Sequence, residues 1–270
     1  MQIAAKIAAD SINPCGNRLT TFLLTMPKFL VAQFNTHRDI SRNSASSRAI
    51  PTAKIIEQVQ TDPFIPIAFG KNQRGMAVGS AISEQDAARK IWKEAADSAA
   101  LSAFRLSQFG VAKSQVNRLL EPFMWTTVLA TATRWSNFFA LRCAEDAQPE
   151  IQALALLMRD AYESNQPAQL RKGDWHAPLL TDEDYDTASE CDDPTQTLME
   201  ICIAHCARVS YTLHDEPLTP QSAKRLYNSL IENGHWSPFE HVACALDQPT
   251  PSGNFVGFLQ YRKTFQNECR

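Results

Sequence analysis

The sequence predicts an α+β fold in which a mixed or antiparallel sheet is flanked by long helices, with residues 1–270 in a single domain. Runs rich in Thr, Val and Phe, as at 123–132, are typical of strands, and apolar residues at helical spacing over 83–110 predict a long helix. The single domain follows because no low-complexity tract or linker divides the chain, which is long enough to bury its own core.

The first third of the chain combines strand-like and irregular segments. The apolar stretch 19–34 is interrupted by Met26-Pro27-Lys28, so we predict a strand, a turn, and then a helix or a second strand. Residues 36–48 are dense in Ser, Arg and Asn and have almost nothing to bury, which is typical of a loop. Residues 61–80 are rich in Pro and Gly and are expected to be irregular.

The middle of the chain holds the longest predicted helix. It begins at Ser83, with Asp86 three positions later as an approximate capping box, and ends at Gly110. A shorter helix over 114–120 and a strand over 123–132 follow. Further along we predict helices at 134–145, 148–164, 196–206 and 218–233, a loop over 166–196, and a pair of strands at 239–247 and 254–262.

Charge and apolar patterning exclude two classes of partner. The formal net charge is −3 and the pI is about 6.1, so no overall basic field would attract a nucleic acid polymer. No apolar stretch reaches the length of a membrane span, and Met1 to Asp10 lack the apolar core of a signal peptide. We therefore expect a cytoplasmic protein that does not bind membranes.

The seven cysteines are scattered along the chain without the pattern of a disulfide framework. Cys202 and Cys206 are four residues apart with His205 between them, but no second ligand pair follows at the spacing of a zinc site. We therefore predict no metal site, and we expect these two thiols to be buried on one helix face.

The segment from His37 to Arg48 has an unusual composition, with three arginines, one histidine and four serines in twelve residues. The planar fork of arginine matches phosphate oxygens, and serine hydroxyls and backbone N–H groups can complete a cradle for an anion. A solvated surface loop is the alternative, but the segment lacks the Lys and Glu that usually face solvent. We therefore predict an anion-binding segment.

The spacing within this segment resembles the motif of the flavin-dependent thymidylate synthases of the ThyX type. That motif runs Arg-His-Arg and then Ser, Asn, Ser and Arg at fixed spacings. The chain has matching residues from the second position on: His37, Arg38, Ser41, Asn43, Ser46 and Arg48. The stretch from Phe29 to Phe34 also resembles the run that precedes the motif.

Two further blocks resemble the same family. Residues 117–122 are similar to its Ala-Arg-x-x-Leu-Pro, and residues 137–151 to its Asn-Phe-x-x-Leu-Arg…Ala-Gln-x-Glu-Ile helix. Residues 207–211 and 234–241 resemble its Ala-Arg-Val-Ser and Gly-His-x-Ser-Pro-Phe-Glu-His. In common members this last block comes first, so the chain resembles a permuted, phage-like branch with a ThyX-like fold and rearranged block order, which is tolerable where the old termini lie close together.

The resemblance implies a ThyX-like catalytic domain that methylates dUMP to dTMP. FAD would be the cofactor, methylenetetrahydrofolate the one-carbon donor and NADPH the reductant. None of the seven cysteines lies in the arginine-rich segment, which fits a flavin route without a cysteine nucleophile. The family also implies a homo-oligomer, a tetramer with FAD between subunits, in the cytosol of a bacterium or a phage-infected host.

The resemblance also assigns roles to individual residues. Gln33, Ser46 and Arg48 would hold the phosphate and sugar of dUMP, and Arg118 and Arg142 would grip its two ends. Five residues would contact FAD: His37, Arg38, Asn137, Ser210 and His241. Arg142 and His37 are the predicted catalytic residues, because an arginine near a uracil carbonyl would stabilise negative charge that develops on the ring.

Three positions depart from the family pattern. Thr36 stands in place of the first Arg of the triplet, Ser44 in place of an acidic residue, and Thr131 in place of an Asn that contacts the flavin. These departures motivate two alternatives: a related enzyme that transfers another group, such as a hydroxymethylase, and an inactive nucleotide or flavin binder. A nucleic-acid-binding module is a further hypothesis for the basic segment, which the net charge disfavours.

Some of the assigned residues also have a structural interpretation. Arg118 and Arg142 could cap helices or form ion pairs with Glu121 and Glu145. His241 closes the Ser-Pro-Phe-Glu-His run and could be a structural histidine of a turn.

Overall fold

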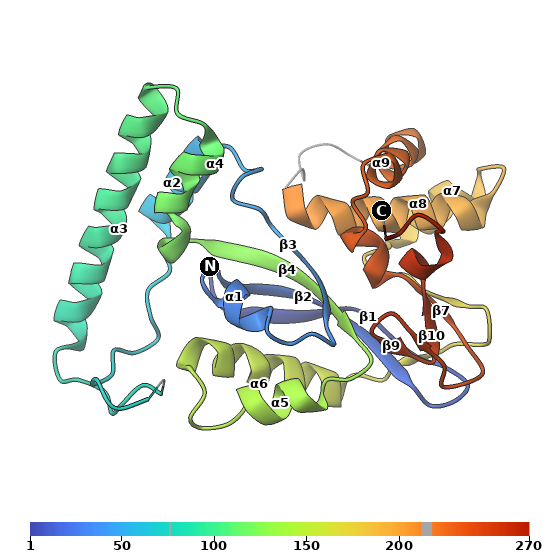
Figure 1. The fold of residues 1–270 in the computed structure, drawn as a ribbon, viewed down its shortest axis with the longest axis horizontal. Helices are drawn as coiled ribbons and strands as arrows, with labels where there is room; N and C mark the ends of the chain where they lie inside the picture. The colour runs from blue at the N-terminus through green and yellow to red at the C-terminus, as the bar shows by residue number, and fades with distance from the viewer. Residues whose placement is uncertain (76, 212–217, 270) are drawn as a thin grey trace.

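The computed structural model describes residues 1–75, 77–211 and 218–269, without the side chains of Ser210 and Tyr211. Its centre is a five-stranded sheet in the order β3-β4-β2-β1-β5 (Figure 1). The strands are β1 (Ala4–Ile12), β2 (Arg18–Pro27), β3 (Ser41–Ser44), β4 (Trp125–Ala132) and β5 (Ala168–Gln169). Neighbours are antiparallel except β1 and β5, which are parallel, so the predicted α+β class with a mixed sheet is confirmed.

The remaining elements surround this sheet. The α-helices are α1 (Leu30–Phe34), α2 (Thr52–Thr61), α3 (Gln85–Gln108), α4 (Lys113–Val116), α5 (Ser136–Arg142), α6 (Pro149–Ser164), α7 (Asp182–Ser189), α8 (Pro194–Tyr211) and α9 (Pro220–Glu232). Short 3-10 helices are η1 (Asn117–Leu119), η2 (Glu121–Phe123), η3 (Ser237–His241) and η4 (Tyr261–Thr264). Two small sheets contain β6 (Trp175–His176), β7 (Ala243–Ala245) and β10 (Phe258–Gln260), and β8 (Pro251–Ser252) with β9 (Phe255–Val256).

Alternate side chains of the central strands serve two different cores, as the period of a strand requires. Phe22 and Leu24 of β2 belong to the core that includes residues of α5 and α6. Leu23 and Leu129 point to the opposite face, where they join the core around α8 that contains Cys202 and Cys206. Both thiols are fully buried, as predicted.

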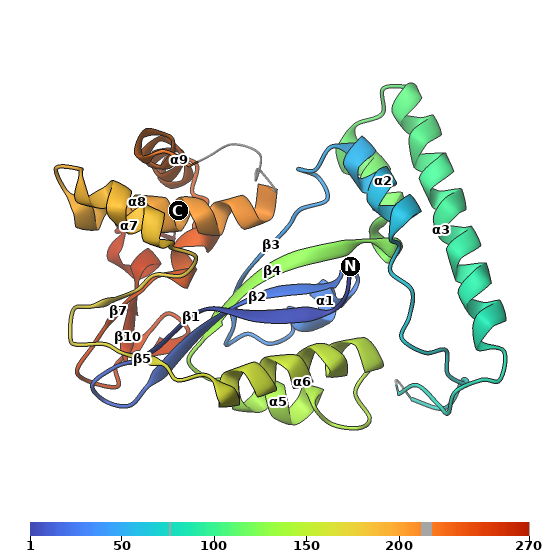
Figure 2. The ribbon, with the colours of Figure 1, turned by 180° about the vertical axis from the view of Figure 1, so that it is seen from behind.

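Two groups of helices stand at opposite ends of the sheet. α2, α3 and α4 share a core of their own at one end, and α7, α8 and α9 lie at the other end with the C-terminal strands (Figures 1 and 2). Among the described residues, no helix has the length and apolar character needed to cross a membrane.

Many predicted elements are confirmed, and others differ for local reasons. Helices α5 and α6 and strand β4 lie where they were expected, and the 19–34 stretch is a strand followed by a helix. The long helix begins at Gln85, and its N-cap Glu84 makes no side-chain cap bond, so the capping box predicted at Ser83 is wrong. The predicted 166–196 loop is also wrong in part, because it contains α7, which Thr181 and Asp184 begin with a capping box.

Candidate active site

The segment from His37 to Arg48, predicted to be a loop, contains an edge strand of the main sheet. Strand β3 pairs with β4, with Ser41 opposite Thr131. Ser41 and Asn43 are buried, whereas Arg42 and Ser44 are partly exposed. The loop prediction was wrong here because the buried side of this strand is polar, so the segment lacks the apolar alternation that signals a strand.

The buried side chains of β3 join the segment to the third motif block. Asn43 Nδ2 donates to the carbonyl of Cys206 at 2.8 Å, and Ser237 Oγ donates to Asn43 Oδ1 at 3.1 Å. Ser41 Oγ accepts from Gln260 Nε2 at 3.2 Å. Two blocks that lie far apart in the chain, and in an unusual order, are therefore adjacent in space.

The first and second motif blocks meet at His37 and Arg142. Arg142 Nε donates to His37 Nε2 at 2.9 Å, and its Nη2 lies 3.4 Å from Thr36 Oγ1. The His37 ring also contacts Phe138 edge to face, with centroids 4.9 Å apart. Burial lowers the pKa of His37, and the charges of Arg142 and Arg42 lower it further, so the imidazole is kept neutral and free to accept.

Arg42 extends this basic group toward helix α1. Its Nε donates to Asn35 Oδ1 at 2.6 Å, and its Nη1 donates to the carbonyl of Ile40 at 2.7 Å. Asn35 is the C-cap of α1 and also lines a large cavity. Among the described residues, Arg142 bonds to His37 and Thr36 rather than forming the alternative pair with Glu145.

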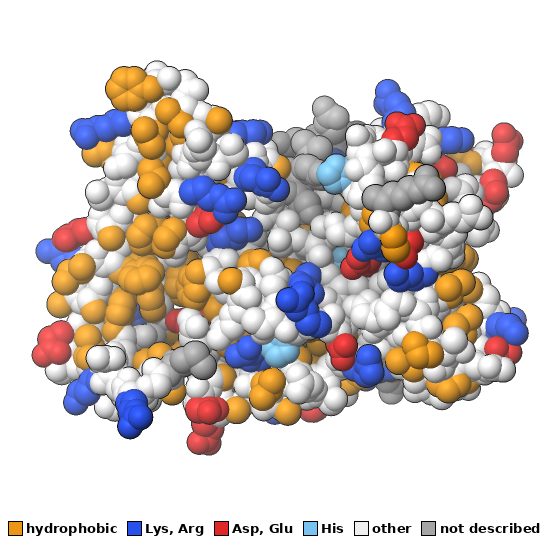
Figure 3. All heavy atoms as spheres, viewed as in Figure 1, with side chains coloured by type: hydrophobic (Ala, Val, Ile, Leu, Met, Phe, Trp, Pro, Cys, Tyr) orange, Lys and Arg blue, Asp and Glu red, His pale blue; other side chains and the backbone are white. Residues whose placement is uncertain are grey.

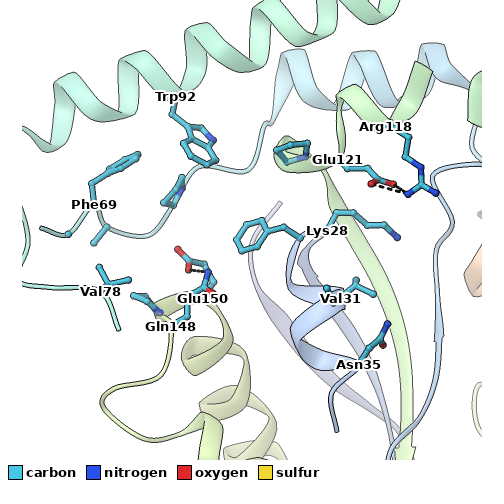
Figure 4. A pocket seen from close by; sticks show the side chains of 17 residues that line it. Lys28, Val31, Asn35, Phe69, Val78, Trp92, Arg118, Glu121, Gln148 and Glu150 are labelled. Carbon is cyan, nitrogen blue, oxygen red and sulfur yellow. Dashed lines mark hydrogen bonds and ion pairs between the residues drawn. The ribbon is translucent and has the colours of Figure 1, made fainter. Parts of the chain in front are cut away.

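This cavity, of about 1010 Å³, lies along α1 and faces α3 and the start of α6 (Figure 4). Phe29, Phe69 and Trp92 supply aromatic walls, and the Trp92 indole donates to the carbonyl of Phe64 at 2.8 Å. Figure 3 shows the corresponding hydrophobic area beside α3, with Lys and Arg side chains toward the middle of the molecule. The volume and apolar walls are typical of small-molecule and cofactor sites.

Lys28, Arg118 and Glu121 lie at one side of the cavity (Figure 4), and with Ser47, which bonds to Glu121, they form a polar cluster. Glu121 accepts from Arg118 Nη1 at 2.9 and 3.1 Å and from Ser47 Oγ at 2.6 Å. Lys28 Nζ donates to the carbonyl of Ala45 at 2.6 Å. Burial lowers the pKa of Lys28, while the charge of Glu121 raises it and that of Arg118 lowers it. The structural interpretation of Arg118, an ion pair with Glu121, is therefore confirmed.

The other residues assigned to ligands are more dispersed. Arg38, Arg48 and Asn137 are exposed, and Gln33 and Ser46 are partly buried. Gln33 Oε1 is a buried acceptor with no hydrogen-bond partner among the described residues. Ser210 is in the last turn of α8, but its side chain lies outside the described part of the chain.

His241 belongs to a row of buried, hydrogen-bonded polar side chains that runs across neighbouring strands of the main sheet. Its Nδ1 lies 2.8 Å from Thr131 Oγ1, which is 2.8 Å from Thr21 Oγ1. The chain continues to His176 Nε2 at 2.8 Å, and His176 Nδ1 lies 2.9 Å from Ser11 Oγ. Burial lowers the pKa of His176 to about 4 and that of His241 to about 3. His241, which the resemblance assigns to FAD, therefore contacts Thr131, which stands where the family has an Asn, and both residues are buried.

Three members of the polar cluster, Lys28, Ser47 and Glu121, were not among the site residues predicted from sequence, although Ser47 lies within the segment predicted to bind an anion. Lys28 follows Pro27 at the end of β2, where it had been taken only as part of a turn. Glu121 carries a signal that was available, because the similar family block has Leu at this position, before Pro122. An acid beside an arginine assigned to phosphate is a departure with direct electrostatic consequences.

Comparison with known proteins gives one sequence match and several structural likenesses. Residues 18–168 match the family model described as thymidylate synthase complementing protein, so the third block lies outside the matched range. No curated protein matches the chain at a significant level.

The structural likenesses include two structures of the UMP/dUMP methylase PolB from Streptomyces cacaoi. The structure bound with 5-Br UMP has 19% identity and a TM-score of 0.49, covering 60% of this chain and 88% of the other. The structure bound with 5-Br dUMP has 22% identity and a TM-score of 0.44, covering 54% of this chain and 66% of the other.

Proposed function

We propose a function for this chain from one premise: it belongs to the family of thymidylate synthase complementing proteins. On that premise it is an enzyme that methylates dUMP to dTMP, using FAD, methylenetetrahydrofolate and NADPH. The observation that carries this proposal is the bond between Arg142 and His37, because it joins two motif blocks 105 residues apart into one basic group. Such a group suits an anionic pyrimidine nucleotide.

The cations near the two ends of α1 suggest how the nucleotide is held. Arg118 and Lys28 lie at one side, where a phosphate would bind, together with Ser46 and Arg48 of the neighbouring segment. Arg142 lies beyond the opposite end of α1, where it would stabilise negative charge on the uracil ring. The family resemblance assigns Gln33, on α1 between these ends, to the nucleotide; its side-chain carbonyl oxygen is buried without a partner among the described residues, and Gln33 does not line the cavity.

The residues assigned to FAD fit that cofactor in part. His37 packs on Phe138, and the exposed Asn137 directly precedes Phe138 in the same helix, so His37, Arg38 and Asn137 would hold the flavin at the surface. His241 is fully buried, and we assign it an indirect role through Thr131. When bound, FAD supplies the two electrons that the methylation needs, and the chain supplies orientation and electrostatics.

His37 and Arg142 have separate tasks in this proposal. The neutral imidazole accepts from Arg142 Nε and fixes the direction of the guanidinium. The donors of Arg142 that these contacts do not use are then available to a pyrimidine carbonyl. Cys143, the thiol nearest to Arg142 in sequence, has its pKa raised by burial, which keeps it protonated and fits a route without a cysteine nucleophile.

We also propose that the active form is a homo-oligomer, a tetramer. Arg38, Arg48 and Asn137 are exposed in the single chain, so a flavin held by them would be open to solvent on one side. A second copy would cover it and exclude water.

The visible spectrum of the purified protein tests the proposal most directly. We expect a yellow protein that dithionite bleaches, and NADPH oxidation that increases when dUMP is added. Adding methylenetetrahydrofolate and dUMP to the reduced protein should yield dTMP, identified by mass. A colourless protein that FAD does not reconstitute would refute the flavin assignment.

A related enzyme that transfers another group is the second candidate. It is favoured by Thr131, which bonds to His241 where the family pattern has a flavin-contacting Asn. A product heavier than dUMP by a hydroxymethyl group rather than a methyl group would support it. Tight binding of dUMP and FAD without any turnover would support an inactive binder instead.

A further inference from the structure

Glu121 lies among the groups that would hold a nucleotide phosphate. One of its carboxylate oxygens accepts from both Arg118 and Ser47, and the other accepts from Arg118. Lys28 is close enough for the charge of Glu121 to raise its pKa. An arginine, a hydroxyl and a lysine are the donors that proteins use for phosphate, so this carboxylate occupies an anion site.

The resemblance to the family block gives no reason to expect an acid at this position. Glu121 opens the 3-10 helix η2 beside Pro122, and the similar family block has Leu at that position. Its side chain is 24% exposed and its partner Arg118 is 58% exposed, so the pair does not fill a core. Because Arg118 is exposed, the ion pair itself contributes little to stability, and the structural part of Glu121 is its bond with the buried Ser47 hydroxyl.

We propose that Glu121 is a specificity-determining residue, a resident anion that competes with the phosphate of the substrate for Arg118, Ser47 and Lys28. A phosphate must displace the carboxylate, so part of its attraction to these donors is cancelled. The chain then discriminates only weakly between a pyrimidine nucleoside monophosphate and the nucleoside without phosphate. This inference deepens the proposed function, because it concerns the same nucleotide.

The test compares three ligands in matched variants. Inorganic phosphate, dUMP and deoxyuridine are titrated calorimetrically into the protein at constant ionic strength, near pH 8 where the phosphate is a dianion. Glu121→Gln removes the charge with little change of shape, and Glu121→Leu also removes the acceptor that could retain Arg118. Glu94→Gln is the control, because Glu94 is an exposed residue of α3 outside the cavity lining and its change alters net charge equally.

We expect both Glu121 variants to bind phosphate and dUMP about tenfold more tightly or better, a change of roughly 1.4 kcal/mol. Deoxyuridine affinity should stay within about twofold, and Glu94→Gln should match the unaltered protein. If dUMP binds the unaltered protein but neither Glu121 variant gains affinity, the inference is wrong and the proposed function stands. If phosphate binding tightens but dUMP binds no variant, the inference stands and the proposed nucleotide is wrong. Unchanged phosphate and dUMP affinities in both variants overturn the inference.

Discussion

The guanidinium of Arg142 donates to the imidazole of His37 across 2.9 Å, which requires Nε2 of His37 to be without a proton. Burial and two neighbouring arginines favour that neutral form. The contact thus couples the orientation of one residue to the protonation state of another.

Replacing Arg142 should change both His37 and activity. In Arg142→Gln we expect the pKa of His37 to rise, since the second-largest cause of its lowering is removed while burial remains. The value is measured by NMR titration of the ring protons. The rate of dTMP formation should fall about 100-fold or more, the scale for loss of one charge-stabilising donor. Arg159→Gln, on α6, should leave both quantities unchanged; an unmoved His37 pKa in Arg142→Gln would contradict the coupling.

Replacing Gln33 should change dUMP affinity and thermal stability in different ways. Its Oε1 is buried without a partner among the described residues, so Gln33→Met removes a polar atom that costs free energy in the unliganded protein. We expect the thermal midpoint to stay level or rise, while dUMP affinity falls about tenfold, the loss of one hydrogen bond to a ligand. A lower midpoint with unchanged dUMP affinity would show that Gln33 is structural.

Asn43 should be a stability residue although it lies in the basic segment. Asn43→Ala leaves the carbonyl of Cys206 and the hydroxyl of Ser237 without their partner. We expect a loss of about 1–3 kcal/mol in the free energy of unfolding, measured with urea. Ser44→Ala, on the more exposed side of the same strand, is the matched control and should lose less than about 0.5 kcal/mol. Equal effects of the two changes would contradict the assigned role.

The buried histidines should make stability depend on pH. Their folded pKa values, about 4 for His176 and about 3 for His241, lie below the ordinary value of 6.5. The unfolded chain therefore binds protons first, so their contribution is complete above pH 6.5 and is lost as pH falls toward these values. Between about pH 7.5 and pH 5 the loss is roughly 2 kcal/mol for each histidine.

Urea unfolding across this pH range measures the dependence. The variant His176→Gln, which keeps hydrogen-bonding atoms without a titrating ring, should show a shallower fall than the unaltered protein. An identical pH dependence in the two proteins would mean that His176 titrates normally when folded.

The features that could be predicted from sequence are those that depend on residues close together in the chain. The strand β4 has a β-rich composition, and the pair Arg118–Glu121 has the spacing of an ion pair. Strand β1 was not predicted, because its nine residues include four alanines, which are poor strand formers, and it is fixed by pairing with β2. The contact of His37 with Arg142 depends on packing between distant segments, which spacing alone does not determine.

The two sides of strand β3 have different roles. Arg42 and Ser44 of this strand are partly exposed. The alternate residues Ser41 and Asn43 are buried and hydrogen-bond to the C-terminal part of the chain. Because facing alternates at every residue, replacing Arg42 leaves the bonds of Ser41 and Asn43 intact and removes only its own bonds to Asn35 and the carbonyl of Ile40. Inserting a single residue between Ser41 and Asn43 would instead reverse the facing of the residues that follow and turn Asn43 away from Cys206 and Ser237. Substitution at the partly exposed positions of this strand should therefore be tolerated better than a change in the length of the strand.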